Sequence, residues 1–93
     1  MINKKIIKIR VKLDKLDIQM LNIIKKRTIL VNSILKNKNH KKDIIDKKRI
    51  NIILKKIKKQ SKQKKIDWKI TNQIWINMIN AFIKYEYRNF NKK

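Results

Sequence analysis

Apolar residues recur along the first third of the chain in alternating steps of three and four residues. The series is Leu13, Leu16, Met20, Ile23, Arg27, Leu30 and Ile34, with one arginine in an apolar position. This spacing places the side chains on one face of a helix, and we predict a helix over residues 4–36. At 1.5 Å per residue the helix is about 50 Å long, which is too long for a compact monomer of this size.

A second, shorter helix is predicted over residues 44–60. Its apolar positions, Ile50, Ile53, Leu54 and Ile57, have the i, i+3, i+4, i+7 spacing of one helix face. A polar connection, residues 37–42, precedes it, and Asp43 is the expected N-cap, with Asp46 in the first turn. The polar stretch SKQKK, residues 61–65, is predicted to be the next loop.

A third helix is predicted over residues 68–90, with Asp67 as its N-cap. Its apolar stripe is Ile70, Ile74 or Trp75, Met78, Ile79 and Phe82. One long and two shorter helices predict an all-α fold in a single domain, residues 1–93, whose bundle is completed by a second copy of the chain.

Composition excludes several kinds of site. The chain has no Cys, Gly or Pro and one histidine, His40, so it lacks disulfides, thiolate sites, glycine-rich phosphate loops and multi-histidine metal clusters. No apolar run approaches the roughly 18 residues of a membrane span, and the N-terminal sequence lacks the features of a secretory signal. We therefore expect a cytoplasmic protein without a membrane partner.

The formal net charge is +22, and it has two interpretations. One is a polyanionic partner, such as nucleic acid. The other is a composition rich in Ile, Lys and Asn, in which lysine fills any solvated position. The lysines are spread over all three segments without an aromatic stacking pattern, which favours composition over a nucleic-acid partner.

Arginine is the more informative cation, because its planar guanidinium binds a carboxylate through two hydrogen bonds. Arg27 and Lys38 are eleven residues apart, so on a continuous helix they share a face and could hold the two ends of one small dianion. Arg10, about 25 Å before Arg27 along the helix, could reach that ligand only from an antiparallel partner helix. The alternatives are a salt-bridged or snorkelling Arg27 and a solvated Lys38.

These residues resemble the all-helical chorismate mutases, which include the closely related isochorismate pyruvate lyases. The resemblance covers residues 6–90. Its first motif is an arginine, an aspartate seven residues later and a second arginine ten residues after that: Arg10, Asp17 and Arg27. Lys38 follows at the position of the family's essential lysine. The second helix opens with DKKR, Asp46 to Arg49, and MINAFIKYEY places Glu86 at the family's Gln/Glu position.

The resemblance implies an intertwined helical homodimer that rearranges chorismate to prephenate without a metal or other cofactor. Arg27, and Arg10 from the partner subunit, would bind the two substrate carboxylates. Lys38 would face the ether oxygen, and Asp46 and Arg49 would support the edge of the site. Glu86 would donate a hydrogen bond only when protonated, so activity should fall as pH rises; its alternative is a helix-end acid in solvent.

Two departures from the common mutase pattern leave the substrate open. Ile50 follows Arg49 where many mutases have a glutamate, and Phe82 replaces a small hydroxyl residue. Together with the spacing from Lys38 to Arg49, Ile50 resembles the lyase branch, which would convert isochorismate to salicylate and pyruvate. The third hypothesis, from another class, is a basic helical nucleic-acid-binding protein.

Overall fold

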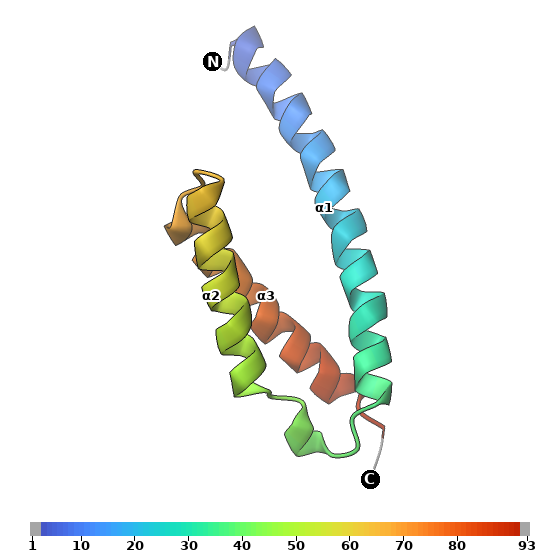
Figure 1. Cartoon of the computed structure of the whole chain (residues 1–93). Coiled ribbons are helices and arrows are strands. Elements are labelled where there is room, and N and C mark those ends of the chain that lie inside the picture. The colour runs from blue at the N-terminus through green and yellow to red at the C-terminus, as the bar shows by residue number, and fades with distance from the viewer. Residues whose placement is uncertain (1–2, 92–93) are drawn as a thin grey trace. The chain divides into compact units, whose positions relative to one another are not determined.

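The computed structural model describes residues 3–91, which form three α-helices and one short 3-10 helix without a strand (Figure 1). The predicted all-α class is confirmed. The chain divides between Val31 and Asn32 into two compact units.

The first helix, α1, comprises Lys4–Lys36, as the apolar spacing predicts. Asn3 caps its N-terminus, because the Asn3 side-chain oxygen accepts a hydrogen bond from the backbone N–H of Ile6 at 3.0 Å. Within the first unit, every described residue before Arg27 is exposed. The apolar stripe of this helix is therefore formed but unpacked in a single chain.

The connection from α1 to the second helix contains the 3-10 helix η1, Lys41–Asp43. The Asp43 carboxylate accepts a hydrogen bond from the backbone N–H of His40 at 3.1 Å and stabilises this turn. Ile44 then anchors the connection, with only 3% of its surface exposed. The prediction of Asp43 as N-cap of a helix from residue 44 is therefore wrong, because the apolar Ile44 packs as part of the connection.

The second helix, α2, comprises Lys47–Gln63, with Asp46 as its N-cap. Its C-terminus has the hydrogen bonds of a Schellman motif: the backbone N–H of Ile66 donates to the Ser61 carbonyl, and that of Lys65 to the Lys62 carbonyl. Lys65 has a φ of 58°, a left-handed conformation that usually favours glycine. In a chain without glycine, a lysine adopts this position, and the predicted loop at residues 61–65 is shorter because the helix continues to Gln63.

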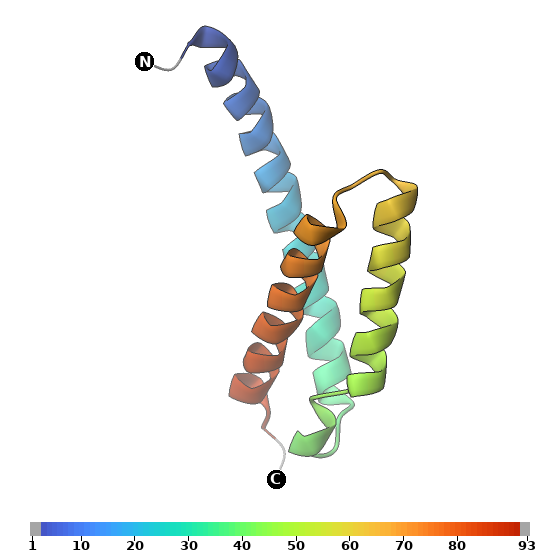
Figure 2. The same ribbon diagram turned by 90° about the vertical axis from the view of Figure 1, so that its left-hand side faces the viewer.

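The third helix, α3, comprises Trp68–Asn89. The predicted N-cap is confirmed, because the Asp67 carboxylate accepts a hydrogen bond from the backbone N–H of Lys69 at 2.9 Å. The tight turn before Asp67 makes α3 run antiparallel to α2, and both views show the two helices side by side (Figures 1 and 2).

Half-buried apolar side chains join α2 to α3. They are Ile50, Ile53, Leu54 and Ile57 from α2, as predicted, and Trp75, Met78, Ile79, Phe82 and Ile83 from α3. Of the predicted α3 positions, Ile70 is exposed at 56%, and of the alternatives Ile74 and Trp75 it is Trp75 that is half-buried, whereas Ile74 is 43% exposed. Buried Thr71 occupies the facing position near the turn, where its hydroxyl lies 2.8 Å from that of buried Ser61. The packed face of α3 is therefore rotated by one residue from the first positions of the predicted stripe.

None of the helices in residues 3–91 combines the length and apolarity that crossing a bilayer requires.

Candidate active site

The side chain of Lys38 is held in place just beyond the end of α1. The backbone N–H of Lys38 donates to the Leu35 carbonyl at 3.2 Å, which fixes the turn that follows the helix. Its ammonium group then donates to the Ile44 carbonyl at 3.2 Å and to the Glu86 carboxylate at 2.9 Å. The long side chain is thus fixed at its charged end by two acceptors from different parts of the second unit.

Glu86 lies near the C-terminal end of α3, 48 residues after Lys38. It is 7% exposed, so its alternative as a solvated helix-end acid is wrong. Glu86 is four residues after Phe82, and both belong to the face of α3 that is turned away from solvent. The helix therefore delivers a carboxylate to an interior position, where the lysine compensates its charge.

The pair is shielded from water by its neighbours. The Lys38 and Glu86 side chains are 18% and 9% exposed, and buried Ile44 lies next to them through its carbonyl. Reduced water access strengthens an ion pair and also raises the cost of leaving either charge alone. Breaking such a pair by removing one partner costs about 3 kcal/mol.

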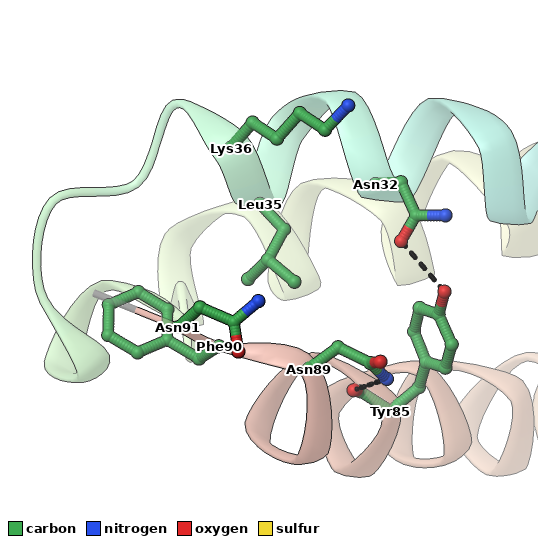
Figure 3. Close-up of a pocket in the computed structure, with 7 residues that line it drawn as sticks. All are labelled: Asn32, Leu35, Lys36, Tyr85, Asn89, Phe90 and Asn91. Atoms are coloured by element: carbon green, nitrogen blue, oxygen red, sulfur yellow. Dashed lines mark hydrogen bonds between the residues drawn. The ribbon is translucent and has the colours of Figure 1, made fainter.

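A half-open pocket of about 360 Å³ lies between the C-terminal parts of α1 and α3 within the second unit (Figure 3). Its lining residues are Asn32, Leu35, Lys36, Tyr85, Asn89, Phe90 and Asn91. The Tyr85 hydroxyl donates to the Asn32 side-chain oxygen at 2.7 Å across this pocket. Phe82 packs edge-to-face against Tyr85, with ring centroids 6.4 Å apart.

Sequence reasoning did not single out Asn32 or Tyr85. Tyr85 is three residues after Phe82, so helical spacing alone would have placed it near the packed face. Asn32 lies outside the apolar series of α1 and carries no comparable signal. Its role depends on the tertiary contact with a residue 53 positions later.

Arg27 lies in the first unit and is half-buried. Its Nε is buried and has no hydrogen-bond partner among the residues that the structure describes. A buried guanidinium donor without a partner costs free energy until it binds an acceptor. Lys38 lies two residues beyond the end of α1, so it is not on a continuous helix with Arg27.

Arg10 is exposed on α1 in the same unit as Arg27. Asp46 and Arg49 are also exposed. The Asp46 carboxylate accepts a hydrogen bond from the backbone N–H of Arg49 at 3.0 Å. Asp46 therefore has a demonstrated structural function as an N-cap. It also borders a shallow depression lined by residues 42, 43 and 45–48.

Chemically, the second unit offers a fixed ammonium group and a carboxyl group that could donate a hydrogen bond when protonated. Within residues 3–91 there is no cluster of three or more His, Asp or Glu residues that could hold a metal ion. The arrangement suits the binding and polarisation of an oxygen-rich organic anion.

The described residues are all-α, and their second unit holds a shielded lysine–carboxyl pair. The profile of the family described as chorismate mutase type II matches residues 9–87, and the chain belongs to this family. Comparison with curated proteins gave no significant match. Comparison with solved structures gave none either.

Proposed function

We propose that the protein is a chorismate mutase, which converts chorismate to prephenate in the cytoplasm as a step of aromatic amino-acid biosynthesis. The family match over residues 9–87 supports this function. The observation that carries it is the 2.9 Å contact between Lys38 and Glu86, the two residues to which the family resemblance gives roles at the ether oxygen.

The reaction is an intramolecular rearrangement in which one C–O bond breaks while one C–C bond forms. No external nucleophile is required, so catalysis depends on holding the reactive conformer and on stabilising charge at the ether oxygen. Lys38 supplies a positive charge and a hydrogen-bond donor to that oxygen. Glu86 supplies a second donor when its carboxyl group carries a proton.

We assign the two substrate carboxylates to Arg27 and to Arg10 of a second subunit. The buried Arg27 Nε without a partner among the described residues supports the first assignment, since a substrate carboxylate would satisfy it. Asp46 and Arg49 are assigned to the edge of the site, Asp46 by orienting the start of α2 and Arg49 by its charge.

The proposed enzyme is a homodimer. Large hydrophobic side chains of α1 before Val31 are exposed at 40–65%: Ile6, Ile7, Ile9, Val11, Leu13, Leu16, Ile18, Met20, Leu21, Ile23, Ile24, Ile29 and Leu30. A helix that is apolar on more than one side is typically enclosed by other elements. A second copy of the chain would enclose it and would bring Arg10 to the neighbouring site.

The second candidate is an isochorismate pyruvate lyase on the same helical frame. Ile50 favours it, because this half-buried residue follows Arg49 where many mutases have a glutamate that assists the lysine. We place the mutase first because aromatic amino-acid synthesis is the commoner need.

Incubation of the purified protein with chorismate and, separately, with isochorismate tests both candidates. Prephenate from chorismate supports the mutase, whereas salicylate and pyruvate from isochorismate support the lyase. Absence of both reactions would contradict the two candidate functions.

Substitution of the assigned cations tests the site. Arg27→Ala and Lys38→Ala should each reduce kcat/KM by about 10²–10³-fold, which is typical for the loss of one preorganised donor to developing charge. Lys84→Ala, which removes an exposed lysine from α3, is the matched control and should retain activity. Full activity in either active-site variant would show that the assignment of that residue is wrong.

A further inference from the structure

The solvent-exposed side of α2 carries an uncompensated positive charge. From Lys47 to Ile66 the chain has nine lysines and one arginine without an Asp or Glu. All nine lysines are exposed. α1 has eight lysines in 33 residues and α3 has two in 22, whereas α2 has seven in 17, so lysine is densest on α2.

Four of these lysines form a row, which we call the α2 lysine row: Lys48, Lys55, Lys59 and Lys62. At 100° per residue their positions lie within about 60° of one another and span about 21 Å along the helix. The row is on the opposite side of α2 from Ile53, Ile57 and Ser61, which face α3. Packing of the helix hairpin therefore leaves the row open to solvent.

The positive charges on α2 destabilise the helix. Like charges recur three or four residues apart in five lysine pairs: 55–58, 55–59, 56–59, 58–62 and 59–62. Pairs at these spacings repel each other on a helix surface. Lys47, Lys48 and Arg49 occupy the first turn, where the helix dipole disfavours cations. A bound polyanion would relieve both effects.

Composition alone explains this arrangement poorly. The whole chain has 24 lysines and 11 asparagines, whereas α2 contains one asparagine, Asn51, beside seven lysines. Lysines occur in all three helices, as the sequence indicated, and α2 places four of its seven in one row on its exposed side.

We propose that the α2 lysine row binds the phosphodiester backbone of a double-stranded nucleic acid without reading its sequence. A duplex presents a negative charge about every 1.7 Å along its axis, so the row faces several phosphates at once. Lysine provides a point charge without the bidentate geometry of arginine. The exposed side of α2 has no aromatic residue on which a base could stack.

An anionic membrane surface is the less suitable partner for this helix. Amphipathic helices bind membranes by burying their apolar side among the lipids. The apolar side of α2 is packed against α3 and is not available for insertion. The proposal is also independent of the enzymatic function, since none of the four lysines is assigned to the active site.

The test measures binding of the full-length protein to labelled mixed-sequence duplexes, one of DNA and one of RNA, by fluorescence anisotropy between about 50 and 200 mM salt. The variant K48Q/K55Q/K59Q/K62Q removes the α2 lysine row. Because each neutralised DNA phosphate contributes about 0.9 to the salt slope, this variant should reduce the magnitude of the DNA slope by about 3–4. Tighter binding of the unsubstituted protein to the DNA or to the RNA duplex shows which nucleic acid the α2 lysine row prefers.

The matched control is K8Q/K12Q/K15Q/K26Q, which removes four exposed lysines from α1 and changes the net charge equally. It should leave most of the salt slope intact. Equal effects of the two variants would overturn the proposal, because they would indicate diffuse attraction by net charge. Binding to vesicles containing phosphatidylserine without binding to either duplex would also overturn it.

Circular dichroism shows whether the two variants remain folded. Both variants should retain their helical signal, because removing mutually repelling charges does not weaken a helix. If the fourfold α2 variant lost that signal, K55Q/K59Q would replace it, with about half of the change in salt slope expected. An unchanged slope in a folded K55Q/K59Q variant would contradict the proposal.

Discussion

At the scale of single residues, the contact between Lys38 and Glu86 is the most informative feature of the molecule. Its atoms are 2.9 Å apart, and the two side chains are 18% and 9% exposed. Charges held at this depth are stable as a pair and costly when separated. A substrate oxygen that takes the place of one partner must therefore provide an equivalent hydrogen bond to the other.

The proposed role of Glu86 is to donate a hydrogen bond to the ether oxygen. Glu86→Gln places an amide donor at the same position and should retain kcat/KM, whereas Glu86→Ala removes the donor and should lower it. Steady-state rates of the two variants, measured side by side, test the role.

The Gln variant also provides the structural control for this experiment. Its amide oxygen can still accept the hydrogen bond from Lys38, so the variant should remain folded. Loss of activity in a folded Glu86→Gln variant would contradict a donating role for Glu86.

The sequence identified Lys38 and Glu86 individually, because each occupies a position that the family pattern marks. It did not reveal their contact in the absence of substrate, which depends on the path of the connection through Ile44. Nor did it reveal Asn32 and Tyr85, since an amide on one helix and a phenol on another carry no joint signal in one chain.

At the scale of elements, the hydrogen bond between Ser61 and Thr71 fixes the top of the α2–α3 hairpin. Both side chains are buried, and their hydroxyl oxygens are 2.8 Å apart. Each hydroxyl satisfies the other in an otherwise apolar contact. The pair therefore stabilises the register of the two helices close to their connecting turn.

A double-mutant cycle measures this contribution. Ser61→Ala leaves the Thr71 hydroxyl with only a weak 3.4 Å bond to the Trp68 carbonyl, and it should lower the free energy of unfolding by about 1 kcal/mol. Adding Thr71→Val should cost less than the sum of the two single changes, because no buried hydroxyl then lacks its partner. Denaturant unfolding provides the measurement, and strict additivity would argue against coupling of the two hydroxyls.

The helix boundaries show where sequence patterns suffice. The bounds of α1 and the N-cap Asp67 follow from local side-chain chemistry and were predicted correctly. The start and end of α2 were missed because tertiary packing overrides the pattern there: Ile44 packs within the connection, and Ser61 packs within a helix that polarity alone had ended.

At the scale of the whole molecule, the described residues of a single chain contain little fully buried apolar surface. Leu35 and Ile44 are the buried hydrophobic residues in this part of the chain. Exposure of the apolar side chains along α1 to water has an unfavourable free energy. Association of two chains, as proposed above, would remove these side chains from water.

If the chain forms the proposed homodimer, its stability depends on protein concentration. A tenfold increase in protein concentration should stabilise the folded dimer by about 1.4 kcal/mol and raise its Tm. Leu16→Glu places a charge in the apolar stripe and should weaken the dimer in sedimentation experiments. Asn22→Glu introduces the same charge on another side of the helix, about 120° from Leu16, and should have little effect.

A Tm that is independent of concentration, together with monomeric sedimentation of the unsubstituted protein, would contradict the homodimer. It would also remove the basis for supplying Arg10 from a partner subunit.

The sequence by itself determined the all-α class, the extent of α1, the start of α3 and the family, because these follow from periodicity, caps and the spacing of a few charged residues. Only the tertiary structure decided that Glu86 is buried against Lys38, that Asp46 starts α2 and that Ser61 and Thr71 share a buried hydrogen bond. The physical reason is that burial and pairing depend on contacts between residues far apart in the chain, whereas periodicity and capping are local.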